Sequence, residues 1–541
     1  MTVVLKEAPV QVFRARRIVT LDGPDVEALA VSGGRVVAVG SAAGVRSRFP
    51  DAELVDLDGV VIPGLNDAHC HLAMASEDLL HLDLSPQSVG SHAELLSVVG
   101  REAEQTLPGG WVRGSRYDDA KTSGGEQLTR WQLDEVTGDV PTLVVHVACH
   151  WGVANSAALV AAGIDDDTAP PAGGDFGRDG TGRPNGVLLE QALFDFANPA
   201  MSATGTSVVP SSTLAERLGG LRRAVEAWHA VGLTSICDCM VGPDDLALFS
   251  EASRRGLLTL RTGMLIAAPH YDLVHRLGLR SGLGGEMLRF VGIKAFVDGA
   301  VGGRTCLVEQ PHRDGGHGIQ STDTEQLRYI VRTVHGDGNL LGVHANGDRA
   351  IRLLLDLFEE AAAADPRPGL RHRIEHCSLV DEQIIKRIAA LDAIAVPFGS
   401  YAQFHGGALL DWYGAERVDH LFAHRDLLDA GVTVAGSSDY PCGPIEPLLA
   451  IQSCVTRTGF DGASIGARQR IGVEEALRVY TTGSAHATGE ADTKGTLLPG
   501  MLADFVVLSD DPRKVDPMTI GSLSVRSTWV GGEQVAASRE G

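Results

Sequence analysis

The sequence contains no long apolar run, because none of its stretches approaches the ~20 consecutive apolar residues that a transmembrane helix needs. Residues 1–17 also lack the apolar core and the small-residue cleavage site of a secretion signal. Eight cysteines are few for 541 residues, and their spacing is not that of a disulfide framework. These absences predict a cytoplasmic protein that has no membrane partner and whose cysteines are buried free thiols.

Positive charge is also scarce. The chain has 46 lysines and arginines against 69 aspartates and glutamates, which gives a formal net charge of −23 spread along the whole sequence. Such a surface repels nucleic acid and anionic membranes, so we expect no nucleic-acid partner. Solubility alone is enough to explain the acidic excess.

The two ends of the chain have β-type patterns. Residues 10–60 alternate short β-type runs with turns, and residues 502–509 and 527–536 are again β-like. The interpretation is that the two ends pair into one β-sandwich domain, made of residues 1–62 and 490–541.

The middle of the chain alternates strand and helix patterns. Residues 213–230 have a helical period, residues 287–297 form a strong strand pattern, and further short apolar strands follow helices up to residue 438. This alternation predicts an α/β fold with a parallel sheet, closed into a (β/α)₈ TIM-like barrel over residues 63–489. A doubly wound sheet fits less well, since no glycine-rich phosphate loop follows a first strand. Residues 75–210 are rich in Gly, Pro and Asp and break the rhythm, which predicts an inserted subdomain after the first barrel strand.

Two histidines follow the first apolar strand of the predicted barrel. His69 and His71 are two residues apart in VIPGLNDAHCHL, so in an extended strand both imidazoles point to one side and can reach one cation. A lone His-x-His pair is weak evidence for a metal site. The preceding Pro-Gly and Asp67 strengthen it here.

Lys294 lies within the apolar strand FVGIKAFVDG. A buried, unpaired ammonium is costly and tends to lose its proton. A neutral amine can take up CO₂ to form a carbamate, an anion able to bridge two divalent cations. The alternative is a lysine that extends to the rim of the barrel.

His344, His376 and Asp439 each follow a different short apolar strand, in LLGVHANGD, HRIEHC and VTVAGSSDYP. One histidine at such a position is usually structural. Together with His69, His71 and Lys294, however, these residues would converge on the carboxyl-terminal face of the barrel, where such enzymes hold their catalytic groups.

These motifs resemble those of the amidohydrolase superfamily, and in particular of the branch that contains N-substituted formamide deformylase. The resemblance runs nearly end to end and is carried by VIPGLNDAHCH, CHWGVANSAAL, GVLLEQAL, IKAFVDGAVGGRT, GVHANGDRAI, RIEHC, AGSSDYP and GTLLPGMLADFVVLSDDP. The paired histidines, IEH and SSDYP are specific to the superfamily. IKAFVDGAVGGRT and HANGDRAI are specific to the branch.

The resemblance implies one or two divalent metal ions per chain, with zinc expected. It implies that His69, His71 and Asp439 bind one metal, that Lys294 bridges as a carbamate, and that His344 and His376 bind the second. It also makes a homodimer an expectation. Cys70, Asn346 and Tyr117 depart from the family pattern, which puts the substrate rather than the metal chemistry in doubt.

The predicted activity is hydrolysis of a C–N bond in a small-molecule amide, most simply an N-substituted formamide or another linear amide. Asp439 is the predicted proton shuttle. Predicted substrate contacts are Tyr117, Asp119, His150, Glu190 and Arg304, although His150 and Glu190 could instead be internal hydrogen-bonding residues. Asp348 is interpreted as a residue that caps a helix or supports a ligand. Two alternatives stay open: a cyclic-amide hydrolase or deaminase, and a non-catalytic regulatory or binding relative. Lys294 argues against a deaminase, and the filled ligand positions argue against a non-catalytic protein.

Overall fold

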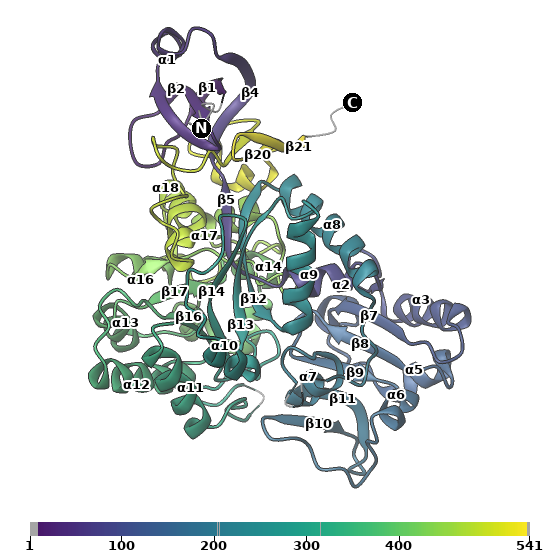
Figure 1. The fold of residues 1–541 in the computed structure, drawn as a ribbon. Helices are drawn as coiled ribbons and strands as arrows, with labels where there is room; N and C mark the ends of the chain where they lie inside the picture. Colours follow the sequence, from purple (N-terminus) through teal and green to yellow (C-terminus); the bar gives the residue numbers. More distant parts are fainter. Residues whose placement is uncertain (1–8, 203, 205, 314, 538–541) are drawn as a thin grey trace.

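A computed structural model describes residues 9–202, 204, 206–313 and 315–537 of the chain. Three sheets organise these residues: one of eight strands, one of seven and one of six. The eight-stranded sheet occupies the centre, with the other two attached to different sides of it (Figure 1).

The central sheet is parallel and is ordered β5-β12-β13-β14-β15-β16-β17-β18. Backbone bonds from Ala68 N to Gly436 O (2.9 Å) and from Asp439 N to His69 O (2.8 Å) connect its first strand to the segment after its last. This closure fits the predicted TIM-like barrel. Its strands are β5 (Leu65–Cys70), β12 (Leu233–Val241), β13 (Arg261–Ala267), β14 (Leu288–Phe296), β15 (Leu340–Ala345), β16 (Arg373–His376), β17 (Ile394–Pro397) and β18 (Thr433–Val434).

Helices cover the outside of the barrel and explain why its strands are apolar on both faces. Every residue of β12 is buried, as a strand between a filled barrel interior and a helical layer must be. Thr213 and Glu216 form a capping box that begins the predicted helix α8 (Leu214–Ala230). Other outer helices are α9 (Pro243–Arg254), α11 (Thr324–Gly336), α12 (Asp348–Ala364), α13 (Glu382–Ala390), α16 (His424–Asp429) and α17 (Pro447–Thr456).

Strands from both ends of the chain share the seven-stranded sheet, ordered β21-β20-β19-β4-β1-β2-β3. Its central strand β4 (Glu53–Pro63) runs directly into β5 of the barrel, so this sheet lies at the amino-terminal ends of the barrel strands (Figure 1). The remaining strands are β1 (Val10–Ile18), β2 (Val26–Ser32), β3 (Arg35–Gly40), β19 (Phe505–Leu508), β20 (Val525–Val530) and β21 (Glu533–Ala537).

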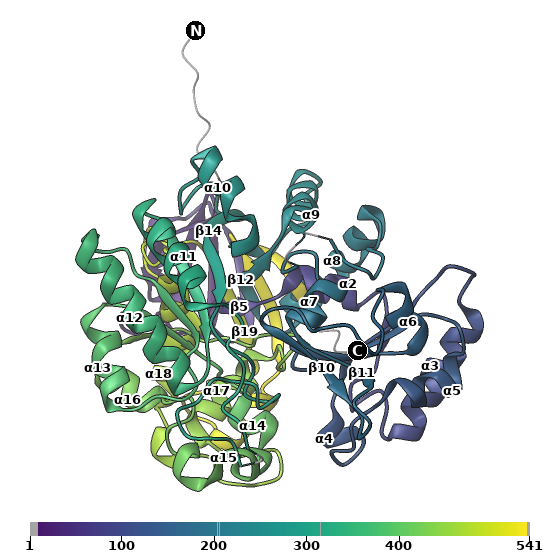
Figure 2. The same ribbon diagram turned by 90° about the horizontal axis from the view of Figure 1, so that it is seen from below.

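The segment between β5 and α8 forms the six-stranded sheet, ordered β10-β11-β9-β8-β7-β6. Both ribbon views show it beside the barrel, next to α8 and α9 (Figures 1 and 2). Its elements are α2 (Leu72–Asp78), β6 (Leu82–Asp83), α3 (His92–Gln105), β7 (Val112–Tyr117), α4 (Asp119–Thr122), α5 (Arg130–Thr137), β8 (Thr142–His146), β9 (Trp151–Ala154), α6 (Ser156–Ala161), β10 (Gly174–Arg178), β11 (Pro184–Glu190) and α7 (Gln191–Ala197). Among the described residues, no helix is long and apolar enough to cross a bilayer.

Candidate metal centre

His69, His71 and Asp439 meet at the carboxyl-terminal end of the barrel. Nε2 of His71 lies 3.1 Å from Oδ1 of Asp439, and Nε2 of His69 lies 3.3 Å from the same oxygen. Two ligands at about 2.0–2.1 Å from a tetrahedral zinc lie roughly 3.3 Å apart. The three side chains are buried, and their spacing therefore fits one shared divalent cation.

Asp67 fixes the two segments that carry these ligands. Its carboxylate accepts hydrogen bonds from the His69 N–H at 3.1 Å, the Ser438 N–H at 3.1 Å and the Ser438 hydroxyl. Asp439 follows with a φ of 53°, a left-handed conformation that few non-glycine residues adopt. The hydrogen bonds of the neighbouring backbone compensate for the free-energy cost of that conformation. They also hold the Asp439 carboxylate toward the two histidines.

Glu375, which the sequence analysis did not single out, orients His69. Its Oε2 lies 2.5 Å from Nδ1 of His69, so Nδ1 carries the proton and Nε2 presents a lone pair toward Asp439. The Arg373 guanidinium binds the same carboxylate at 2.6 and 2.8 Å, and both residues are fully buried. Glu375 directly precedes the predicted ligand His376. Its role could not be predicted from the sequence, because that role depends on a contact between two strands.

Lys294 lies beside His69, with 3.3 Å between its Nζ and Nε2 of His69. It is fully buried, and its ammonium lies 4.6 Å from the centre of the Phe296 ring. Burial lowers the pKa of Lys294 from its usual value. This is the environment that favours a neutral amine, the form that reacts with CO₂.

His344 and His376 extend the cluster beyond His69. The ring of His376 lies 4.6 Å from that of His69 and 4.5 Å from that of His344, measured between centroids. Nε2 of His344 lies 3.0 Å from the Gly299 carbonyl and 2.9 Å from the Asn346 side-chain nitrogen, so both contacts engage Nε2 and neither uses Nδ1. Nδ1 of His376 is buried without a hydrogen-bond partner among the described residues. Burial lowers the pKa of His69, His344 and His376 well below the usual value, so each is the neutral imidazole that metal binding requires.

A cavity of about 130 Å³ opens above these residues and is lined by His344 and Asp439. Of the predicted substrate contacts, Asp119 and His150 line it. Glu190 is buried behind His150, 2.6 Å from its Nδ1, and also accepts from the Thr305 hydroxyl at 2.8 Å. Tyr117 and Arg304 are not among the described residues that line the cavity. Tyr117 packs against Trp151 and its hydroxyl donates to the Glu126 carbonyl, and Arg304 acts electrostatically on Asp119.

An aromatic wall, which was not predicted, forms another part of the lining of this cavity. It comes from the loops and helices after β17, and its members are Phe398, Tyr401, His405, Trp412 and Phe460. Phe398 stacks on His376 with 4.4 Å between ring centroids, which joins the wall to the histidine cluster. Tyr401, His405 and Trp412 lie on the short helices α14 (Tyr401–His405) and α15 (Ala408–Val418), and Phe398 and Phe460 lie in loops, so no single periodic pattern predicts that these side chains converge.

Comparison with known proteins finds the same family along nearly the whole chain. A model described as "Amidohydrolase family" matches residues 53–536, and one described as "Imidazolonepropionase-like composite domain, bacteria" matches residues 28–52. The chain is 31% identical over 95% of its length to a putative amidohydrolase of Bacillus subtilis, YtcJ, of which it covers 96%. It is 33% identical to the N-substituted formamide deformylase of Arthrobacter pascens, over 94% of each protein. The fold resembles that of an uncharacterized metal-dependent hydrolase from Pyrococcus horikoshii OT3, with a TM-score of 0.75, 24% identity, and coverage of 94% of this chain and 99% of that one.

Proposed function

Since this chain belongs to the amidohydrolase family, we propose that it hydrolyses the C–N bond of a linear amide, with small N-substituted formamides as the first candidates. The observation that carries the proposal is the position of Asp439. Its carboxylate contacts both paired histidines and also lines the cavity in which a substrate would bind. The similarity to a formamide deformylase supports the choice of substrate.

The residues present fit a divalent metal centre, for which zinc is the proposed ion. His69, His71 and Asp439 would hold one cation, and His344 and His376 a second, with the carbamate of Lys294 between them. A metal bound here lowers the pKa of water and polarises the scissile carbonyl.

Asp439 performs the proton transfers in the proposed reaction. It is a general base when it accepts a proton from the attacking water and a general acid when it passes that proton to the leaving nitrogen. His150 faces the same cavity, and its Nδ1 donates to the Glu190 carboxylate. Burial opposes the charged form, but Glu190 raises the pKa of His150, and the imidazolium can donate a hydrogen bond from Nε2 to the substrate oxygen. Phe398, packed on His376, helps to exclude bulk water from the reacting atoms.

The first prediction concerns Asp439→Asn, which keeps the size of the side chain but removes its basicity. We expect formate release from N-substituted formamides by the zinc-loaded protein to fall by ~10²–10⁴-fold, the usual contribution of a general acid–base group. Formate release is the assay, and Asp411→Asn, an exposed carboxylate on α15 (Ala408–Val418), is the matched control.

Three results would change the proposal. Near-wild-type turnover in Asp439→Asn would remove its role as proton shuttle. No turnover of any formamide, with bound metal shown by elemental analysis, would move the search to other acylamides, cyclic amides and esters. Failure to retain metal would favour a non-catalytic protein.

A further inference from the structure

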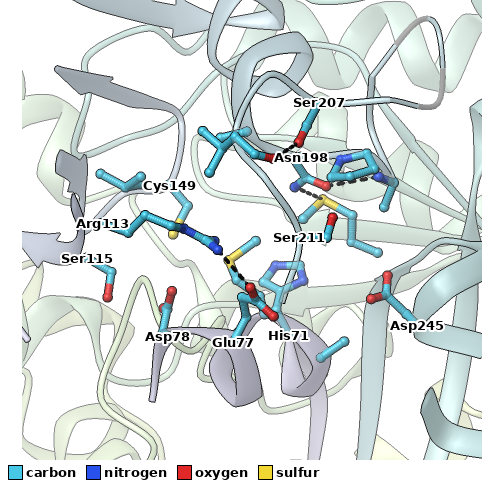
Figure 3. A pocket seen from close by; sticks show the side chains of 18 of the residues that line it. His71, Glu77, Asp78, Arg113, Ser115, Cys149, Asn198, Ser207, Ser211 and Asp245 are labelled. Atoms are coloured by element: carbon cyan, nitrogen blue, oxygen red, sulfur yellow. Dashed lines mark hydrogen bonds and ion pairs between the residues drawn. The ribbon is translucent and has the colours of Figure 1, made fainter. Parts of the chain in front are cut away.

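A second cavity, of about 230 Å³, lies on the other side of His71 from the substrate cavity. It is bounded by α2, by β7 and α7 of the inserted region, and by the start of α9. Figure 3 shows His71, Glu77, Asp78 and Arg113 gathered around it. Nothing in the proposed mechanism uses this space.

Only single side chains separate the two cavities. His71 lines the second cavity, whereas Asp439, 3.1 Å from its Nε2, lines the first. Cys149 likewise lines the second cavity, and its neighbour His150 lines the first. A molecule in the second cavity is therefore one residue away from the groups that act on the substrate.

The second cavity carries more negative than positive charge. Its lining contains five carboxylates, Glu77, Asp78, Asp238, Asp244 and Asp245, against three guanidinium groups, those of Arg113, Arg116 and Arg217. The Arg116 guanidinium is moreover paired at 2.6 Å with Asp83, which lies outside the lining. An occupant with a positive charge fits this balance.

Three lining carboxylates have no ion pair among the described residues. Asp238 accepts the N–H groups of Ala73 and Met240 and Asp244 is exposed on the rim, so Asp78 is the one placed to meet a charged ligand. Arg113 pairs with Glu77 at 2.8 Å, and Arg217 pairs with Asp245 at 2.5 Å. Within the described part of the chain, no salt bridge holds Asp78, and burial raises the pKa of its carboxyl to about 6 against the opposing positive charges of Arg113 and Arg116. Figure 3 shows it between Ser115 and Glu77, facing the open space.

The rest of the wall is apolar and comes mainly from the inserted region. Leu143, Leu193, Phe194 and Val209 line this part. An inorganic cation would gain nothing from such a wall, whereas an organic ammonium ion would bury its substituent there.

A buried nitrogen of His71 is the second feature of this cavity that points to a ligand. His71 is only 7% exposed, and its Nδ1 has no hydrogen-bond partner in the described part of the chain. Metal-binding histidines almost always donate their other N–H to an acceptor. A water molecule that accompanies an ammonium group in the cavity would supply that acceptor.

We propose that this second cavity binds a small organic ammonium ion, with its charged nitrogen on Asp78 and its apolar substituent against Leu143, Leu193 and Phe194. The inference rests on the proposed function for the identity of the ligand, because hydrolysis of an N-substituted amide releases an amine of this class. Binding of the amine product, or of another primary amine, in this cavity then acts on the metal centre through His71.

Calorimetric titration of the zinc-loaded full-length protein with butylammonium and benzylammonium tests this proposal without depending on turnover. We expect Asp78→Asn to weaken binding at least tenfold. Asp244→Asn removes the same charge from an exposed position on the rim and should leave binding unchanged. Butanol and butyrate should bind at least tenfold more weakly than butylammonium. Ala197→Lys, which places an ammonium group of the protein's own at the cavity wall, should abolish amine binding even if Asp78→Asn fails to fold.

The outcomes separate this inference from the proposed function. Absence of binding, or equal binding by wild-type protein, Asp78→Asn and Ala197→Lys, would overturn the second site. Loss of binding in Asp119→Asn instead of Asp78→Asn would place the amine in the substrate cavity and would also overturn it. Binding that depends on Asp78 in a protein that hydrolyses no amide would keep the amine site and reject the proposed reaction.

Discussion

Glu375 shows how much of a metal centre is decided by residues that do not bind the metal. The carboxylate sits between the Arg373 guanidinium and Nδ1 of His69, and all three groups are fully buried. It fixes the tautomer of His69 and also neutralises Arg373. Replacing it therefore affects both metal affinity and stability.

For Glu375→Gln we expect metal affinity to fall by ~10–100-fold, the usual effect of removing the partner of a ligating histidine. Arg373 would also become a buried unpaired cation, at a cost of about 3–5 kcal/mol in the free energy of unfolding. Zinc titration and denaturant unfolding measure the two effects. Glu382→Gln, an exposed carboxylate on α13, is the control. Full zinc affinity in a destabilised Glu375→Gln protein would limit Glu375 to a purely structural role.

Lys294 gives the second prediction at this scale. If its amine takes up CO₂, forming an N–C bond and releasing a proton, the carbamate supplies the oxygen ligands that the unmodified lysine lacks. We expect Lys294→Ala to lose at least one equivalent of metal by elemental analysis, whereas Lys386→Ala, an exposed lysine of α13, should lose none. Growth with ¹³C-bicarbonate should give a carbamate carbon signal in the wild-type protein alone. Unchanged metal content in Lys294→Ala would contradict the bridging role.

The positions of the candidate ligands could be predicted because each follows an apolar strand of a recognisable unit. His69, Lys294 and His344 all lie in or directly after such strands, and the structure brings them together. Asp67 counted in favour of a metal site, but its bonds to Ser438 and the role of Glu375 could not be predicted. Their effects depend on which strands become neighbours after the barrel has closed, and that information is not local.

At the scale of elements, two buried histidines link α11 to β16. The Leu341 N–H donates to Nδ1 of His372, so the Nε2 of His372 carries a proton and donates to Nδ1 of His335 at 2.9 Å. Nε2 of His335 in turn donates to the Asp365 carbonyl at 2.7 Å. The chain of bonds is complete only when both rings are neutral. Burial, together with His335, lowers the pKa of His372 to about 3.

This arrangement predicts acid sensitivity with a definite sign. Because the folded-state pKa of His372 lies below its unfolded value of about 6.5, the unfolded chain binds the extra proton between those two values. The stabilisation is therefore complete above pH ~6.5 and is lost progressively as the pH falls toward ~3, by on the order of 5 kcal/mol in total. We expect His372→Asn, whose Oδ1 can still accept from the Leu341 N–H, to lose less stability than wild type between pH 7.5 and pH 5. Urea unfolding at the two pH values measures the difference, and equal losses would show that His372 does not titrate on unfolding.

The strands and helices of the barrel were more predictable than those of the inserted region. In β12 and α8, periodicity and caps agree with the observed elements. The six-stranded sheet instead contains antiparallel pairs, β8 with β9 and β9 with β11, which do not repeat the strand–helix unit of the barrel. Whether such segments become strands depends on the strands with which they pair. The Gly- and Pro-rich sequence therefore predicted an insertion but did not predict its sheet.

At the scale of the whole molecule, the terminal sheet and the metal centre lie at opposite ends of the barrel. The terminal sheet joins the barrel where its strands begin, and one strong contact there is between Arg261, the first residue of β13, and Asp504, just before β19. The guanidinium holds the carboxylate at 2.6 and 2.9 Å, both side chains are buried, and the Gly531 N–H adds a third bond at 2.8 Å. Residues at this end of a barrel usually serve stability rather than catalysis.

We therefore expect Arg261→Met to destabilise the protein by about 3–5 kcal/mol, because it leaves the Asp504 carboxylate buried without its cation. Metal content should not change, since the site lies at the other end of the strands. In the double variant Arg261→Met/Asp504→Asn the unpaired charge is gone while an acceptor for the Gly531 N–H remains, so most of the lost stability should return. Thermal unfolding midpoints of the wild-type protein, Arg261→Met, Asp504→Asn and the double variant give the coupling between the two residues. A double variant no more stable than Arg261→Met would show that the pair contributes through packing, and that the attachment of the terminal sheet depends on the apolar contacts around it instead.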